Sequence, residues 1–210
     1  MKLYGFWRSI ASYRVRVALH LKGLEFDEPQ INLLEGHQFT PEFLAINPSG
    51  AVPALDIDGH ILTQSMAIME FLEERYPNPP LLPADPFERA EARALAQATV
   101  SDAHPLFVPR VRKYLATTFG ADEHAVHDWA RHWLDKGLQS YEVRLGQRPP
   151  APFVFGAAPG IADIAIKSHA VASGLFGVDM APYERVRALS TALDGIEAFQ
   201  RSKPAAPPTA

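Results

Sequence analysis

The stretch GAVPALDIDGHILTQSMAIMEF, residues 50–71, carries the strongest indications of the fold. Within it, two short strand-like runs flank Asp58-Gly59, a dipeptide typical of a two-residue turn between antiparallel strands. From Ser65 onward, apolar residues recur at helical spacing, and Ser65 itself is a candidate N-cap. The stretch therefore predicts a β-hairpin followed directly by an amphipathic helix.

Upstream of this stretch, strand and helix patterns alternate. KLYGFW (2–7) predicts a strand, residues 12–22 a helix, and FDEPQINL (26–33) a shorter strand. TPEFLAINP (40–48) predicts a helical turn, because Thr40 followed by proline is a favoured helix start. The expected order of the first 80 residues is β-α-β-α-β-β-α.

Downstream, PNPPLLPADP (77–86) holds five prolines in ten residues, which favours an extended connection and not a helix. Helical periodicity then dominates, and we expect helices over residues 87–118, 122–146, 161–175 and 183–200. The tail SKPAAPPTA (202–210) is expected to lack regular structure. We therefore predict an α/β domain over 1–80, a linker over 81–87 and an all-helical domain over 88–210.

Composition excludes several classes of protein. The 210 residues carry a net charge of −4, which gives no basic field for nucleic acid. No apolar run approaches the roughly 18–20 residues of a membrane span, and the N-terminus lacks the pattern of a signal peptide. We expect a cytoplasmic protein that binds neither nucleic acid nor membranes.

The chain has no cysteine, so any thiol that reacts here must be supplied by a ligand. Eight histidines are present but scattered; His124, His127 and His132 are better explained as a solvated helix face than as a metal site. We expect no metal.

Three local features could bind an anionic or peptide ligand. The corner RSIAS (8–12) presents a hydroxyl and unpaired N–H groups where a helix begins. Pro53 suits a sheet edge or a cis turn, and Val52 before it could pair its backbone with an extended peptide. Gln64 and Ser65 stand at a helix start, where carboxylates bind. Each feature also has a plain structural explanation, as a helix cap or as a loop-to-strand proline.

In combination these features resemble the glutathione transferase superfamily, and within it the zeta-like group of maleylacetoacetate and maleylpyruvate isomerases. The resemblance covers nearly the whole chain. It rests on the order and spacing of RSIASYRVRVALHLKG, VPAL, QSMAIMEFLEERYPNPPLLPAD, YLATTFGADE, FGVDMAPY and EAFQRSKP. It implies a thioredoxin-like N-terminal domain that binds glutathione, and a helical domain that shapes the site of an electrophilic second substrate.

The resemblance also implies roles for single residues. Ser9 matches the serine that donates a hydrogen bond to the glutathione sulfur. Val52 matches the residue whose backbone pairs with the cysteinyl part of the peptide, before a cis proline matched by Pro53. Gln64 and Ser65 match the pair that holds the γ-glutamyl carboxylate.

Further matches concern the rest of the ligand and the assembly. Gln38 matches a residue near the glycyl end, Asp102 one that reaches the γ-glutamyl amine across a dimer interface, and His104 one that approaches glutathione from the helical domain. Arg8 adds positive charge beside the sulfur, and Arg110 is the arginine expected at the second substrate. Members of the family are usually homodimers, so we expect one here.

The implied reaction is a cis–trans isomerisation. The glutathione thiolate adds to the double bond of a cis-enedione acid, the resulting single bond rotates, and loss of glutathione leaves the trans product. A helix N-terminus and a serine hydroxyl favour the thiolate that this requires.

The chain departs from the zeta pattern in three places. Ile10 and Ala11 replace a serine and a cysteine at the corner, and Leu175 stands where relatives carry an arginine for a substrate carboxylate. The residues before Arg110 are the apolar Val108 and Pro109. These changes leave two alternatives open: conjugation of glutathione to an apolar electrophile, and glutathione binding without catalysis.

The third departure lies at a helix start in the helical domain. Gly160 stands where the superfamily usually has Ser or Thr, three residues before Asp163. Glycine is a permissible N-cap but offers no side-chain acceptor, so the expected cost is a few tenths of a kcal/mol. We interpret this site as a folding element.

Overall fold

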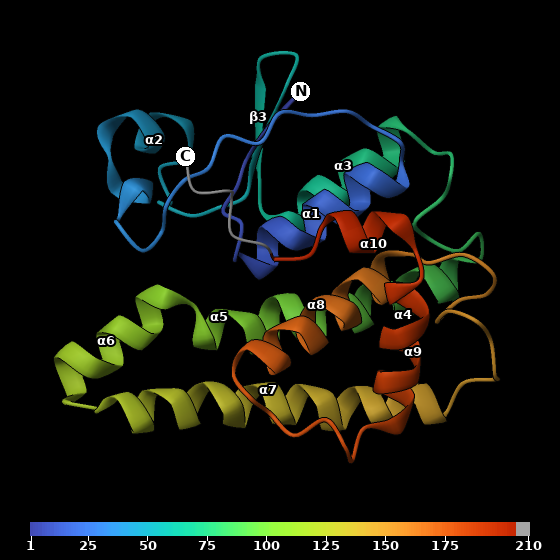
Figure 1. Cartoon of the computed structure of the whole chain (residues 1–210). Helices are drawn as coiled ribbons and strands as arrows, with labels where there is room; N and C mark the ends of the chain where they lie inside the picture. Colours follow the sequence, from blue (N-terminus) through green and yellow to red (C-terminus); the bar gives the residue numbers. More distant parts are fainter. Residues whose placement is uncertain (205–210) are drawn as a thin grey trace. The chain divides into compact units, whose positions relative to one another are not determined.

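The chain forms an α/β unit and a helical unit in the computed structural model, which describes residues 1–204 (Figure 1). Among the described residues, the first unit comprises Met1–Leu81 and Ile196–Pro204, and the second comprises Leu82–Gly195. This architecture confirms the predicted fold class. At the C-terminal end, residues 196–204 cluster with the first unit, whereas the predicted boundaries put them in the helical domain.

The elements of the first unit are β1 (Lys2–Tyr4), α1 (Ile10–Leu21), the 3-10 helix η1 (His37–Phe39), α2 (Pro41–Ile46), β2 (Ala54–Ile57), β3 (His60–Thr63), α3 (Ser65–Arg75) and α10 (Glu197–Arg201). Those of the second unit are α4 (Pro86–Gln97), the π-helix η2 (Ala98–Ala103), α5 (His104–Phe107), α6 (Pro109–Phe119), α7 (Glu123–Gly146), α8 (Ile161–Leu175) and α9 (Glu184–Asp194).

The sheet of the first unit has the order β1-β2-β3, and both pairs are antiparallel. At the hairpin, Asp58 and Gly59 both have positive φ, at 53° and 82°, as a turn of the predicted type requires. The Gly59 N–H also donates to the Asp56 carboxylate over 3.1 Å.

The predicted strand at 26–33 runs parallel to β1 but forms only isolated bridges, Lys2 with Asp27 and Gly5 with Gln30. The backbone of Asp27 bonds to Met1 and Leu3 on one side, and the pairing resumes where the Ile31 N–H donates to Gly5 over 2.7 Å. Pro29 stands between these contacts and has no N–H to contribute, which breaks the ladder into bridges.

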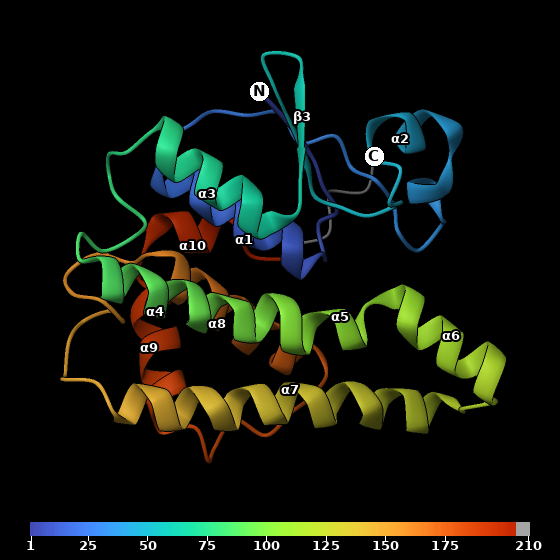
Figure 2. The same ribbon diagram turned by 180° about the vertical axis from the view of Figure 1, so that it is seen from behind.

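Helices α1 and α3 lie side by side, with their N-terminal ends at the same end of the pair (Figures 1 and 2). A buried ion pair joins their C-terminal ends, where the Lys22 ammonium lies 2.7 Å from the Glu73 carboxylate. Lys22 also donates to the Pro79 carbonyl over 2.6 Å, and Glu73 accepts from the Leu81 N–H over 2.7 Å. This ion pair therefore fastens the Pro-rich connection to the first unit.

Helix α10 packs against α1. Ser202, just beyond α10, is fully buried; its hydroxyl lies 3.0 Å from the His20 ring and its carbonyl accepts from Arg16. Residues 202–204 lie outside the helices and strands, as expected, although side chains of α1 hold Ser202 in place. Residues 205–210, which the same expectation covers, lie outside the described residues.

In the second unit α8 is the central helix, and α4, α7 and α9 all pack against it (Figure 2). Every residue from Ile161 to His169 is buried, which explains the apolar character of this stretch. Its one imidazole is accommodated by polar partners, since the His169 ring lies 2.8 Å from the Leu134 carbonyl and 3.3 Å from the Thr99 hydroxyl.

Two of the predicted helices are divided in the structure. The predicted helix 87–118 becomes α4, η2, α5 and α6. The division between α5 and α6 falls at Pro109, which cannot donate a backbone hydrogen bond and begins a new helix. The predicted helix 183–200 ends at Asp194 and resumes as α10 after the residues Gly195 and Ile196.

Candidate functional site

The corner between β1 and α1 is organised around Ser9. Ser9 is the N-cap of α1, and its Oγ accepts a hydrogen bond from the Ser12 N–H over 3.2 Å. The hydroxyl proton is therefore available to donate to a ligand. The first turn of α1 contains no acidic residue, and the N–H groups of Ile10 and Ala11 have no hydrogen-bond partner within residues 1–204. The corner thus favours an anion.

Two side chains hold the backbone of this corner in place, and a third fixes one of them. The Arg16 guanidinium donates to the Trp7 carbonyl over 3.2 Å and pairs with Glu28 at 2.7 Å. The Trp7 N–H donates to the Gln30 side chain over 2.8 Å. Arg8, the adjacent residue, is exposed. The corner is therefore a fixed loop in which the exposed Arg8 is the residue next to Ser9.

The loop before β2 presents the backbone of Val52. The Val52–Pro53 peptide bond is cis, as the sequence resemblance implies. The Asn47 amide fixes the preceding residue by donating to the Ala51 carbonyl over 2.6 Å. The N–H and C=O of Val52 have no hydrogen-bond partner in the described part of the chain, which leaves them for an added peptide strand.

At the start of α3 the structure corrects one expectation. Ser65 is the first residue of the helix, and Gln64 occupies the N-cap position without a side-chain cap bond. The Ser65 hydroxyl accepts instead from the Nε of Arg14, over 3.0 Å. Gln64 has φ 68° and ψ 116°, a backbone conformation that is strained in a residue with a side chain.

Gln38 lies in η1 and is 9% exposed. Its side-chain oxygen is buried and has no hydrogen-bond partner among residues 1–204. A buried polar atom without a partner is costly, so the position is suited to a ligand donor. Together with Ser9, Val52, Pro53, Gln64 and Ser65, Gln38 belongs to the first unit.

The remaining predicted residues lie close together in the chain within the second unit. Asp102 is exposed on the π-helix η2, which is followed directly by His104 at the start of α5. The His104 ring packs edge-on against Phe107 with centroids 5.3 Å apart. Arg110 is exposed in the first turn of α6.

Near the C-terminal end of α8, Leu175 is 41% exposed where the zeta pattern has an arginine. The next residue, Phe176, carries the Arg112 guanidinium 5.3 Å above its ring. Arg112 also donates to the Phe107 carbonyl over 3.1 Å. A guanidinium therefore lies one residue from Leu175, although it comes from α6 and not from α8.

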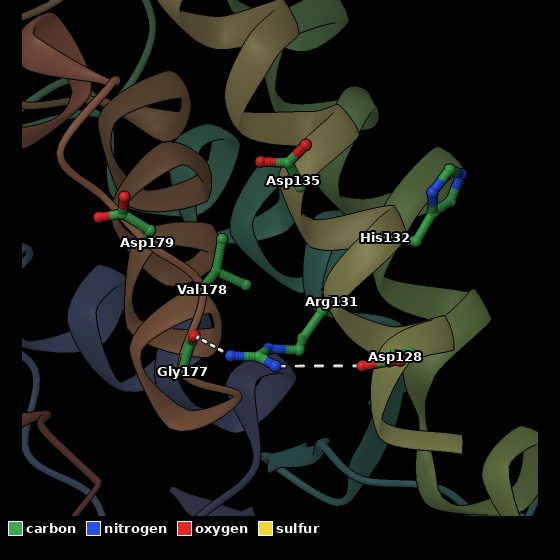
Figure 3. A pocket seen from close by; sticks show the side chains of 7 residues that line it. All are labelled: Asp128, Arg131, His132, Asp135, Gly177, Val178 and Asp179. Atoms are coloured by element: carbon green, nitrogen blue, oxygen red, sulfur yellow. Dashed lines mark hydrogen bonds and ion pairs between the residues drawn. The ribbon is translucent and has the colours of Figure 1, made fainter. Parts of the chain in front are cut away.

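A shallow cavity of about 340 Å³ in the second unit contains none of the predicted site residues. It is lined by Asp128, Arg131, His132, Asp135, Gly177, Val178 and Asp179 (Figure 3). Arg131 donates to the Gly177 carbonyl over 2.7 Å and lies 3.9 Å from Asp128, so its charge is already engaged. Within residues 1–204 no three His, Cys, Asp or Glu side chains are placed to hold a metal ion, and no helix is long and apolar enough to cross a membrane.

Comparison with known proteins shows the family. Residues 1–74 match the model of the glutathione S-transferase N-terminal domain. The chain is 42% identical over 209 residues to the maleylpyruvate isomerase of a Ralstonia species, with 99% of both chains covered. The chain belongs to the glutathione S-transferase family, among its zeta-class isomerases.

Solved structures of this family agree closely with the fold. A holo maleylpyruvate isomerase, described as a bacterial zeta-class glutathione S-transferase, superposes with a TM-score of 0.96 at 42% identity, covering 99% of both chains. The maleylacetoacetate isomerase of Methylobacterium extorquens AM1, solved with glutathione and malonate, superposes with a TM-score of 0.94 at 44% identity, covering 97% of this chain and 96% of that one.

One residue beside the predicted site was missed by the sequence analysis. Arg14 lies in the RVR part of the family motif, and sequence reasoning gave it no role. The available signal in the sequence was an arginine within the mostly apolar run that forms α1. The structure buries this run, and Arg14 is only 1% exposed. A charged side chain is seldom buried this deeply without a partner.

Proposed function

We propose that the protein is a glutathione-dependent isomerase that converts a small cis-enedione acid, maleylpyruvate or maleylacetoacetate, to its trans isomer. The observation that carries this proposal is the 42% identity to a maleylpyruvate isomerase across both units of the chain. The Ser9 corner supports it, because a helix start without acidic residues and with an available hydroxyl proton suits a thiolate.

Ionisation of the glutathione thiol is the first requirement. A free thiol has a pKa near 8.5, so little thiolate is present at neutral pH. At the corner, the Ser9 hydroxyl donates to sulfur, and the N-terminus of α1 and the exposed Arg8 add positive potential. A fall of about one to two units in the thiol pKa would make much of it reactive at pH 7.

The isomerisation needs no atom beyond those of substrate and thiolate. The sulfur lone pair forms a C–S bond to one alkene carbon, and the alkene π electrons move onto the conjugated carbonyl oxygen as an enolate. The former double bond rotates. The enolate then reforms the alkene in the trans geometry and expels the thiolate, so glutathione is regenerated. Cationic side chains stabilise the enolate.

The remaining roles follow the same proposal. The Val52 backbone pairs with the cysteinyl residue before Pro53, Gln38 lies near the glycyl end, and Gln64 and Ser65 hold the γ-glutamyl carboxylate. All of these positions lie within residues 1–80, the proposed glutathione-binding domain.

Helical residues complete the proposed site. Arg110 binds the substrate carboxylate through its planar fork, and His104 approaches glutathione. Asp102 reaches the γ-glutamyl amine from the partner chain of a homodimer. We place the enzyme in the cytoplasm, in the breakdown of aromatic amino acids and related compounds.

A spectrophotometric assay tests the proposal directly. Maleylpyruvate and maleylacetoacetate are supplied separately, with and without a catalytic amount of glutathione, beside a generic aromatic electrophile. We expect isomerisation of a cis acid that depends on glutathione without consuming it. Loss of one glutathione per turnover, or no turnover of either acid, would contradict the isomerase.

A second candidate function is conjugation of glutathione to an apolar electrophile, and the half-exposed Leu175 favours it. Leu175→Arg separates the two. If the substrate is a dicarboxylate, the added guanidinium should lower KM for it by roughly tenfold, as a charge-assisted hydrogen bond allows. Leu175→Met is the matched control. A higher rate with the aromatic electrophile in wild type, and no gain with the acid in Leu175→Arg, would favour conjugation.

A further inference from the structure

A buried arginine lies behind the proposed carboxylate site of the first unit. Arg14 is the fifth residue of α1 and is 1% exposed, which makes it one of the largest fully buried side chains among residues 1–204. Its Nε donates to the Ser65 Oγ over 3.0 Å, and it makes further interactions as well. Burying a guanidinium is unfavourable unless polar partners replace the hydrogen bonds that it made to water. The placement of Arg14 therefore calls for a structural or functional explanation.

The hydrogen bond from Arg14 determines what Ser65 can do. A serine hydroxyl has one proton and two acceptor lone pairs. Because Ser65 Oγ accepts from a charged donor that carries no acceptor, its own proton must point to another group. Ser65 is 4% exposed, so few other directions are open to it. Arg14 therefore both orients and polarises the Ser65 O–H donor.

The surroundings of Ser65 favour an anion in front of that proton. Ser65 is the first residue of α3, an eleven-residue helix whose first turn contains no acidic side chain. Its N-terminal N–H groups face outward along the helix axis, and the strained backbone of Gln64 leads into them. A carboxylate here would meet the hydroxyl and the helix start in front, with the guanidinium behind Ser65.

We propose that Arg14 is a positioning residue for the γ-glutamyl carboxylate of glutathione, acting through Ser65. The inference rests on the proposed function, because it takes glutathione as the ligand of the first unit. It goes beyond that function by assigning selectivity for this carboxylate to a residue that never touches the ligand. Arg14 makes the site prefer a γ-glutamyl peptide over the same peptide without the α-carboxylate.

The test compares two ligands on several variants. Calorimetry gives Kd for glutathione and for its analogue in which 4-aminobutyrate replaces the γ-glutamyl residue and removes the α-carboxylate. For wild type we expect glutathione to bind about 10- to 100-fold more tightly, the range of a charge-assisted hydrogen-bond set. For Arg14→Met and Ser65→Ala we expect the preference to fall to about threefold, with little further loss in the double variant.

Arg75→Met is the control for the loss of one positive charge. Arg75 lies in the last turn of α3 at its exposed end, and this variant should keep the wild-type preference. Kinetics give a second measure: Arg14→Met should raise KM for glutathione and leave kcat within about twofold of wild type. If Arg14→Met does not fold, Arg14→Lys carries the test, since lysine has a methylene group where arginine has Nε.

The outcomes are distinguishable. A wild-type preference that persists in a folded Arg14 variant would overturn the role of Arg14 and leave the proposed function intact. A wild type that binds neither ligand would overturn the proposed function itself.

Discussion

Ser9 performs two tasks with a single hydroxyl group. It accepts a hydrogen bond from the Ser12 N–H, which caps α1, and it keeps its own proton for a ligand. The explanation of Ser9 as a plain N-cap and the explanation as a thiolate partner are therefore compatible. A variant that removes the hydroxyl loses both, so the two effects must be measured separately.

We expect Ser9→Ala to lower kcat for isomerisation by about 10- to 100-fold, because a hydrogen bond to a charged group contributes about 1.5–3 kcal/mol. Glutathione affinity should change far less. Ultraviolet absorbance of the bound thiolate against pH checks the cause, since the thiol pKa should rise in the variant. Ser9→Thr keeps the hydroxyl and is the matched control. Unchanged turnover in Ser9→Ala would contradict the role of the hydroxyl.

Gln64 combines an unfavourable backbone conformation with an exposed side chain. We expect Gln64→Gly to raise the free energy of unfolding by about 1 kcal/mol, because glycine adopts positive φ without strain. The same change should weaken glutathione binding through loss of the amide. Urea denaturation and calorimetry measure the two effects.

Gln64→Ala separates the two contributions. It removes the amide but keeps a Cβ at φ 68°, so affinity should fall as in the glycine variant while stability stays at the wild-type value. Equal stability of the glycine and alanine variants would show that the backbone at Gln64 stores no strain.

At the scale of single elements, α8 begins with an unusual cap. Gly160 offers no side-chain acceptor, but the Asp163 carboxylate accepts from the Gly160 N–H over 2.9 Å and from the Val154 N–H over 3.0 Å. Asp163 thereby ties the preceding loop to the most buried helix of the second unit. Burial raises the pKa of the Asp163 carboxyl from 3.8 to about 6, against the lowering effect of these hydrogen bonds.

This pKa predicts a dependence of stability on pH. The folded protein holds the Asp163 proton more tightly than the unfolded chain, so the free energy of unfolding should fall as pH rises from about 4 to 6. The rise in the Asp163 pKa to about 6 corresponds to a loss of roughly 3 kcal/mol in the free energy of unfolding across this pH range. Urea denaturation of wild type and Asp163→Asn between pH 4 and 7 measures this loss, since only the wild type has a carboxyl group that titrates at position 163. Parallel curves for the two proteins would contradict the assignment.

At the scale of the whole molecule, a ligand that binds the folded chain stabilises it by mass action. At glutathione concentrations of about 100 times Kd the expected gain is about 2.7 kcal/mol, which for a chain of this size raises Tm by roughly 5–10 °C. Differential scanning fluorimetry with sodium glutamate as the control measures the shift. No shift at saturating concentration would count against glutathione as the ligand.

Local chemistry determined much of this structure. The Asp58-Gly59 turn, the Thr40-Pro41 helix start and the cap at Ser9 were predictable from residues that are neighbours in the chain. Family resemblance, confirmed by the comparisons, identified the fold and the class of enzyme. The roles of individual site residues stay predictions, although the cis bond at Pro53 was anticipated correctly.

By itself, the sequence determined where most helices and strands form, because capping, turn formation and periodicity act between residues a few positions apart. Tertiary structure decided what those elements present to a ligand. Ser65 was expected to cap α3, but its hydroxyl instead accepts a hydrogen bond from the buried Arg14, 51 residues earlier. Helix α10 likewise joined the first unit through contacts with α1. Such partners are distant in the chain, and only packing of the folded chain brings them together.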